Sequence, residues 1–179
     1  EGLLAWHRHD SGGCVGMVDS TQENVWPHWY RQRVEMLWST LNLYHDTGLT
    51  MQDKRILFRS RESLPQLFSD FNDNCVLVHG CFTLRSMLKD ARTDQLLAMV
   101  GPGMMLWAPR EYELFRLADG GLGEQLLWRY LQRAPVAESF VWRRWLYQLW
   151  DEVESLVNTG LFDRARFSFA AKSILPWIA

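Results

Sequence analysis

Hydrophobic residues in the middle of the chain form short runs of strand length, separated by polar residues, glycine and proline. Four such runs stand at residues 75–85, 95–100, 104–109 and 111–115. Short apolar runs at close, regular spacing are typical of an antiparallel sandwich or barrel, whereas βαβ units alternate strands with longer helical segments. Residues 54–59 are predicted to form the first strand of the same barrel. The pattern therefore predicts a small antiparallel, jelly-roll-like β-barrel in an α+β fold.

Glycine and proline mark two sharp bends within these runs. Gly80 interrupts an apolar run, where glycine usually indicates a bulge or a bend that lets a strand wrap around a small barrel. Gly101, Pro102 and Gly103 follow the next run. The proline fixes φ and the glycines can take a positive φ, so this segment is expected to form a corner.

A helix is predicted before the barrel, beginning at Pro27 in its first turn and ending at residues 46–48. Apolar residues recur there at every third or fourth position, which is the helical period. They are Trp26, Tyr30, Val34, Leu37, Trp38, Leu41 and Tyr44. Residues 60–74 are mostly polar, and four apolar residues among them are expected to anchor one helical turn or a folded loop.

The longest predicted helix covers residues 136–157, where neither glycine nor proline interrupts the chain. Its apolar stripe is broad enough to contact two surfaces. Residues 158–160 are expected to end this helix, and a second helix is predicted from residue 162 to about 174. Residues 119–123 are predicted to be a loop. The run at 124–131 is too short to distinguish a last barrel strand from a helix.

The first 26 residues are predicted to be an arm or a hairpin, with short strands at residues 3–6 and 14–18. The predicted organisation is thus an N-terminal arm (1–26), a helix with a sensory-type barrel (27–131) and C-terminal helices for dimerisation (132–179).

Composition narrows the class of protein. The chain has 179 residues, of which 47% are hydrophobic, and a net charge of −2, so no basic surface indicates nucleic-acid binding by this piece alone. No run reaches the roughly 18 apolar residues of a membrane span. The three cysteines show no metal-type pairing and are expected to be reduced, and a cytoplasmic location is the default.

The sequence contains none of the complete catalytic or metal-binding motifs considered below. His7 and His9 resemble half a metal site, but no third ligand stands at a recognisable spacing, so a solvated pair is the better interpretation. A metal-dependent cupin would need further histidines, and only His79 falls in the predicted barrel. No nucleophile elbow or phosphate-binding glycine motif is present. We therefore expect no enzymatic activity, no metal and no cofactor.

The order of helix, barrel and long striped helix resembles the cyclic-AMP receptor protein family. Residues 76–84 (Val-Leu-Val-His-Gly-Cys-Phe-Thr-Leu) resemble a strand pair of that family, and residues 96–103 are similar to its next strand and glycine-ended corner. The chain is most similar to divergent regulators of the IprA/YaiV type, in which a tryptophan-rich helix follows the barrel, as in residues 139–150. This resemblance covers roughly residues 30–175.

The resemblance implies a cyclic-nucleotide-binding-domain-like barrel that serves sensing or dimerisation, and a long helix that pairs across a two-fold axis. A winged helix beyond it would bind DNA. The predicted dimer interface consists of Val141, Trp142, Trp145, Leu149, Val153 and Leu156. Only residues 162–179 remain after that helix, too few for a helix-turn-helix, so DNA binding would need a missing or separate region.

The segment after the corner departs from the pattern of cyclic-AMP binders. It lacks their Gly-Glu pair, and Arg110 is the only candidate phosphate ligand, with an ordinary surface arginine as the alternative. Met104 and Trp107 could line a small-molecule pocket, although packing in the core is the other interpretation. Cyclic AMP is therefore not expected to bind.

Taken as a whole, the sequence predicts the effector and dimerisation domain of a bacterial transcriptional regulator, acting as a homodimer without membrane contact. The alternative is a protein–protein interaction module without DNA binding, such as an adaptor or a secretion-system accessory protein that holds a partner with its tryptophan-rich helix.

Overall fold

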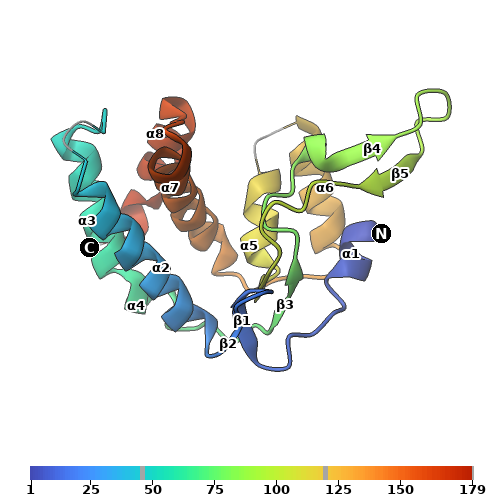
Figure 1. Ribbon diagram of the computed structural model, residues 1–179, viewed down its shortest axis with the longest axis horizontal. Coiled ribbons are helices and arrows are strands. Elements are labelled where there is room, and N and C mark those ends of the chain that lie inside the picture. Colours follow the sequence, from blue (N-terminus) through green and yellow to red (C-terminus); the bar gives the residue numbers. More distant parts are fainter. Residues whose placement is uncertain (45–46, 119–120, 179) are drawn as a thin grey trace. The chain divides into compact units, whose positions relative to one another are not determined.

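The computed structural model describes residues 1–44, 47–118 and 121–178, and the chain divides into two compact units (Figure 1). The first unit consists of Glu1–Trp26 and Asp73–Ala137. The second unit consists of Pro27–Asn72 and Glu138–Ala179. Each unit thus combines two separate stretches of sequence.

Two antiparallel sheets lie in the first unit. A four-stranded sheet has the order β2-β1-β6-β3, and β4 pairs with β5 in a separate hairpin, which projects from the rest of the unit in Figure 1. The strands are β1 Cys14–Met17, β2 Gln22–Glu23, β3 Cys75–Val78, β4 Met87–Lys89, β5 Leu96–Met99 and β6 Leu106–Pro109. In the central pairing, Val76 lies opposite Ala108 and Val78 opposite Leu106.

The predicted jelly-roll barrel is wrong, because the described strands form two small open sheets. Residues 111–115 were expected to be a strand, but Glu111–Leu114 form helix α5. All four residues of α5 are buried, so no alternation of exposed and buried side chains is available to distinguish strand from helix. Residues 75–78, 96–99 and 106–109 were correctly predicted to be antiparallel strands, although no pairing partners were predicted for them.

Short helices complete the first unit. They are α1 Gly2–Trp6, η1 Leu84–Ser86, α5, η2 Phe115–Leu117 and α6 Gly121–Leu131. The strand expected at residues 3–6 is therefore helical, and the run at 124–131 belongs to a helix. Of the loop predicted at 119–123, residues 121–123 begin α6, and residues 119–120 lie outside the described part.

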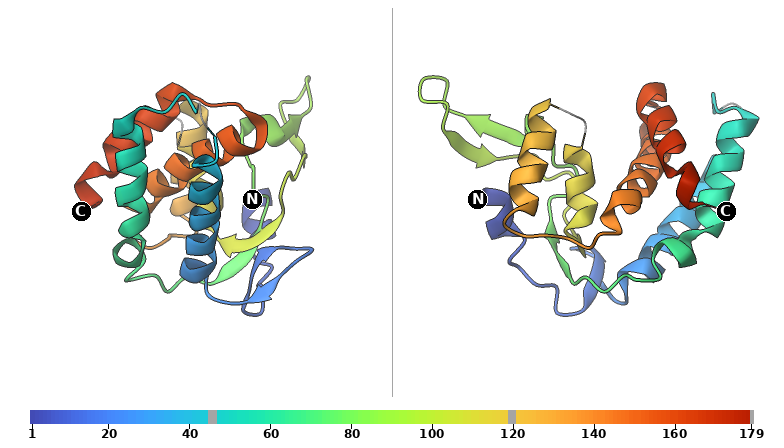
Figure 2. Two further views of the ribbon diagram at one scale, coloured as in Figure 1. Left: turned by 60° about the vertical axis from the view of Figure 1, so that its left-hand side comes forward. Right: turned by 180° about the vertical axis from the view of Figure 1, so that it is seen from behind.

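Helices make up the second unit. They are α2 Trp26–Leu41, whose first residue belongs to the first unit, α3 Met51–Glu62, α4 Leu64–Leu67, α7 Phe140–Thr159, α8 Arg164–Ile174 and η3 Leu175–Trp177. Helices α7 and α8 pack side by side (Figure 2). The predictions of α2, of α7 and of a helical turn near residue 64 are confirmed, and Gly160 ends α7 with a φ of 74°. The stop expected for α2 at residues 46–48 is wrong, because the helix ends at Leu41 and residues 42–44 lie outside it.

Residues 54–59, predicted as the first barrel strand, lie instead in α3. Thr50 begins this helix with a capping box, in which its side chain accepts the N–H of Asp53 while the Asp53 carboxylate accepts the N–H of Thr50. Ile56, Leu57 and Ser60 then face inward at helical spacing. The helix start signal therefore outweighs the short apolar run of this segment.

Candidate functional site

The first unit carries an irregular loop, His79–Ser86, between β3 and β4. It begins with a forced turn, because Gly80 has a φ of +82° and a Cβ at this position would lie 2.0 Å from the carbonyl oxygen of Met104. Only glycine fits this conformation and this approach. Gly80 thus ends the strand and starts the loop; it does not bend a barrel strand as the sequence suggested.

A buried carboxylate holds the start of the loop. Glu113 of α5 accepts backbone N–H groups from three loop residues: His79 and Gly80 at Oε2, the latter at 3.3 Å, and Phe82 at Oε1, at 3.1 Å. Burial raises the pKa of Glu113, while Arg116 and the three N–H donors oppose that rise. The buried helix α5 therefore supports the loop.

The loop also contacts the corner at residues 101–103. The Cys81 Sγ lies 3.4 Å from the carbonyl oxygen of Gly101 and accepts the N–H of Gly103 at 3.2 Å. A Cβ on Gly103 would lie 2.7 Å from that sulfur, so the contact requires glycine. His79 reaches the same strand end, with Nε2 at 3.1 Å from the Val100 carbonyl oxygen. Two segments about twenty residues apart are thereby joined in one site.

Ser86 closes the loop. The side chain of Thr83 accepts the N–H of Arg85 at the start of η1, while the Oγ of Ser86 accepts the N–H of Thr83 at 3.2 Å. Ser86 is buried, and its hydroxyl is engaged within the loop. The loop is therefore ordered by its own hydrogen bonds as well as by Glu113.

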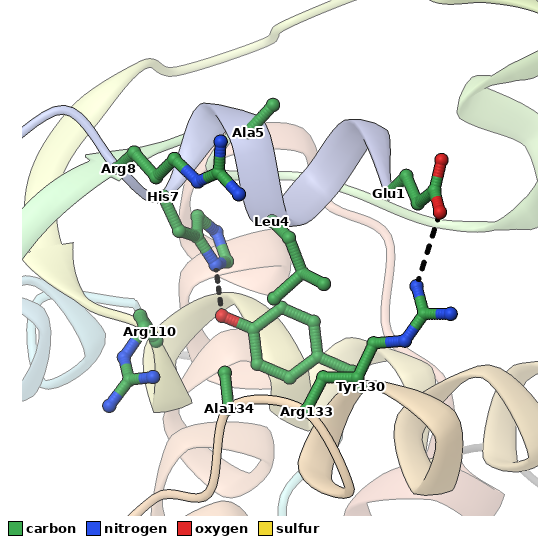
Figure 3. Close-up of a pocket in the computed structure, with 9 residues that line it drawn as sticks. All are labelled: Glu1, Leu4, Ala5, His7, Arg8, Arg110, Tyr130, Arg133 and Ala134. Atoms are coloured by element: carbon green, nitrogen blue, oxygen red, sulfur yellow. Dashed lines mark hydrogen bonds and ion pairs between the residues drawn. The ribbon is translucent and has the colours of Figure 1, made fainter.

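A second feature of the first unit is a pocket of about 620 Å³ between α1, the end of α6 and Arg110 (Figure 3). Its lining residues are Glu1, Leu4, Ala5, His7, Arg8, Arg110, Tyr130, Arg133 and Ala134. His7 is buried, and its Nδ1 lies 2.7 Å from the Tyr130 hydroxyl oxygen. Its Nε2 has no hydrogen-bond partner among the described residues.

The charges around His7 determine its protonation. Burial and the nearby Arg110 guanidinium lower the pKa of His7 to about 4, so the imidazole is neutral near pH 7. Arg8 and Arg133 add two exposed guanidinium groups at the rim, and Arg133 lies 3.6 Å from Glu1. A neutral imidazole with a cationic rim is suited to a polar or anionic small molecule.

Of the three residues predicted to bind a ligand, one lines this pocket and two do not. Arg110 lines the pocket, where it donates to the Pro135 carbonyl oxygen at 3.2 Å and lies 3.6 Å from Asp73. Trp107 and Met104 are not among the lining residues of that pocket. Trp107 lies in β6 between Gly16 and Leu77, and the carbonyl group of Met104 faces Gly80.

The residues predicted for a dimer interface occupy different environments on α7. Leu149 and Val153 are completely buried in the second unit. Trp142 stacks on Trp177 with ring centroids 4.6 Å apart, and Trp145 meets the ring of Phe169 edge-on. Val141 is exposed and Leu156 is half-buried. The dimer itself stays a prediction.

Two features are absent from the described residues. No helix in this part of the chain is long and apolar enough to cross a membrane. No group of three or more histidine, cysteine, aspartate or glutamate side chains is arranged to hold a metal ion within the same residues.

Comparison with known proteins places the fold. No family model matches the chain. The chain is 75% identical over all 179 residues to the uncharacterized protein YcbJ of Escherichia coli K12 and to the protein of the same name in Shigella flexneri, and it spans 60% of the length of these relatives.

Solved structures of similar fold are candidate fructosamine-3-kinases. One, from Thermobifida fusca, aligns with a TM-score of 0.74 and 21% identity over 97% of this chain and 62% of that protein. Another, from Haemophilus somnus, has a TM-score of 0.69 and 13% identity, over 97% of this chain and 60% of that protein. The chain thus has the fold of part of these kinase-like proteins.

This likeness overturns the functional prediction. The structures similar to the chain are kinase-like, and they share neither the barrel nor the function of a cyclic-AMP receptor protein-like transcriptional regulator. The expectation of a domain without enzymatic activity is corrected for the same reason, and so are the associated expectations of DNA binding and a jelly-roll barrel.

The loop that joins β3 to β4 was not predicted as a site, although its spacing carried a signal. Protein kinases have a catalytic loop with the pattern His-Arg-Asp-Leu-x-x-x-Asn, followed by Asp-Phe-Gly. His79, Cys81 and Ser86 stand at the spacing of its histidine, aspartate and asparagine. Cysteine and serine stand at the positions where the pattern has aspartate and asparagine, so the reactive residues of the pattern are absent from this segment.

Proposed function

We propose that the chain is part of a kinase-like protein, which binds a nucleotide and a small-molecule acceptor on either side of the His79–Ser86 loop. The observation that supports this best is the juxtaposition of that loop with the Gly101–Gly103 corner through Cys81. In kinases, the catalytic loop and the Asp-Phe-Gly segment must come together at the transferring phosphoryl group. The likeness of fold to two kinase-like proteins supports the same interpretation.

The order of the elements gives further support. Strand β3 leads into the loop, the β4–β5 hairpin follows, and the corner stands directly after β5. Gly103 occupies the place of the glycine in Asp-Phe-Gly, since it is the third residue of the corner. The spacing and the order of the segments therefore agree with the kinase pattern at both places.

The substrate class follows from the similar proteins. Because the structures of similar fold are candidate fructosamine-3-kinases, we propose a sugar-amine adduct as the acceptor and a nucleoside triphosphate as the other ligand of the longer protein. A cytoplasmic location belongs to the same proposal, and the three cysteines, which are free thiols, accord with a reducing compartment.

The test uses the whole protein to which this chain belongs. Isothermal titration with ATP and with ADP should give saturable binding at one site, and a fructosamine such as fructosyl-lysine should bind with a coupled affinity. Mass spectrometry of the acceptor after incubation with ATP then shows whether a phosphorylated product forms. A whole protein that binds neither nucleotide would overturn the proposal.

A matched pair of variants ties the binding to the loop. Glu113→Ala removes the acceptor of three loop N–H groups and should weaken nucleotide binding, whereas Glu62→Ala, at the exposed end of α3, should leave it unchanged. Circular dichroism confirms that both variants are folded. Equal nucleotide affinity in the two folded variants would separate the binding from this loop.

A further inference from the structure

The residues at the metal-binding positions of the kinase pattern do not suit a divalent cation. Kinases hold two Mg²⁺ ions with the aspartate of Asp-Phe-Gly and the asparagine of the catalytic loop. The corresponding residues here are Gly101 and Ser86. We propose that this site holds no Mg²⁺, and that nucleotide binding by the protein is independent of divalent cations. This inference rests on the proposed function for the presence of the nucleotide.

The groups present at these positions are unsuitable donors. Mg²⁺ requires hard oxygen ligands and is usually bound by carboxylates. Gly101 has no side chain, and its carbonyl oxygen already contacts the Cys81 thiol. The Ser86 hydroxyl is neutral, buried and bonded to the N–H of Thr83. Neither position offers a negative charge to a cation.

Cys81 replaces the aspartate of the catalytic loop. A thiol is a soft ligand, which favours ions such as Zn²⁺ or Cu⁺ over Mg²⁺. Its sulfur is also engaged with the corner, where it accepts the N–H of Gly103. The side chain therefore joins the two segments directly, at the point where a kinase would place a carboxylate.

The buried carboxylate beside the loop is not free to bind a cation. Glu113 is the buried acid beside the loop, but both of its oxygens accept loop N–H groups, which keeps them turned toward the backbone. The described residues contain no group of three or more His, Cys, Asp or Glu side chains that could hold a metal. Glu113 therefore does not replace the missing carboxylate.

The backbone at Gly101 nevertheless has room for the missing aspartate. A Cβ on Gly101 would meet no atom within 4 Å, and its φ of +67° is one that aspartate tolerates better than most residues. A triple variant, C81D/S86N/G101D, therefore restores the two metal-binding residues of the kinase pattern at positions 86 and 101 together with the catalytic-loop aspartate at position 81. It provides the gain-of-function arm of the test.

The experiment measures Mn²⁺ binding to the whole protein by electron paramagnetic resonance, with and without ADP. We expect no saturable site in the wild-type protein and one in the triple variant, so that at equal Mn²⁺ concentration the variant binds at least about tenfold more of the ion. The variant G160D is the control for an added carboxylate at a glycine of positive φ in open space, and it should bind no more Mn²⁺ than the wild type.

A second readout is independent of whether the triple variant folds. The wild-type affinity for ATP in EDTA should equal that in excess Mg²⁺ within about twofold. A saturable Mn²⁺ site in the wild type, or a large loss of ATP affinity in EDTA, overturns the inference. If the protein binds no nucleotide at all, the proposed function fails, and the Mn²⁺ titration without ADP still decides whether the site holds a cation.

Discussion

Arg143 and Asp70 form an ion pair in the second unit, with Nη1 and Oδ1 3.0 Å apart, in which the arginine side chain is completely buried and the aspartate is 52% exposed. The guanidinium also donates to the Leu67 carbonyl oxygen and lies over the rings of Phe68 and Phe71. The buried charge thus has its carboxylate partner at the surface, on the segment that follows α4.

Removal of the Asp70 carboxylate should lower the free energy of unfolding by more than is usual for an exposed aspartate. Asp70→Ala removes the carboxylate that lies 3.0 Å from this buried cation, so we expect the free energy of unfolding to fall by about 2 kcal/mol. Urea denaturation measures this change. Asp19→Ala, at another exposed aspartate, should change stability by less than about 0.5 kcal/mol. Equal effects of the two variants would show that the buried arginine does not depend on Asp70.

Stability should depend on pH through His7. Its pKa is lowered from 6.5 to about 4, so between these values the unfolded chain binds a proton that the folded chain does not. The stabilisation is complete above pH 6.5 and is lost as the pH falls toward 4, by about 3 kcal/mol in total. Unfolding free energies measured between pH 4 and 7 should show this slope.

Two histidine variants test the assignment of that slope. His7→Gln should remove most of it, while His9→Gln, at an exposed histidine, should leave it in place. Tyr130→Phe should lower stability at pH 7, because it removes the hydroxyl that lies 2.7 Å from Nδ1. A slope that persists in His7→Gln would assign it to another group.

Alanine at Gly80 should disrupt the candidate loop. The Cβ would overlap the Met104 carbonyl oxygen at 2.0 Å, and φ is positive, so we expect a loss of about 3 kcal/mol or more. Gly13→Ala is a matched control: φ is +89° and no atom lies within 4 Å of its Cβ, so only the conformational cost of about 1 kcal/mol applies. Similar denaturation midpoints for the two variants would contradict the close approach.

Periodicity over many residues predicted the helices of this fold well. Helices α2 and α7 have 16 and 20 residues, enough to show the helical period clearly. The short segments at 54–59 and 111–115 were misassigned, because five or six residues cannot show whether one side or every side is buried. Strands β3, β5 and β6 were assigned correctly, but their pairing depends on distant residues such as Gly16, which lies opposite Trp107.

The candidate site was harder to predict for a chemical reason. A catalytic motif is recognised by its reactive residues, and Cys81 and Ser86 stand where the kinase pattern has aspartate and asparagine. What remains is spacing, together with the glycines at positions 80 and 103, whose necessity is visible only once the Met104 carbonyl group and the Cys81 sulfur are placed beside them. The sequence therefore contained the spacing and the two glycines of the site, but not the aspartate and asparagine by which the pattern is recognised.

The three thiols should react with iodoacetamide at different rates. Burial, aided by the negative charges of Asp73 and Asp10, raises the pKa of Cys75 to about 12, so its thiolate is scarce at pH 8. Cys14 and Cys81 are only partly buried. Peptide mass spectrometry should therefore show both of them modified before Cys75, and all three modified equally in urea. Early modification of Cys75 in the folded protein would mean that β3 opens readily. The adjoining His79–Ser86 loop would then be held less firmly than its hydrogen bonds to Glu113 indicate.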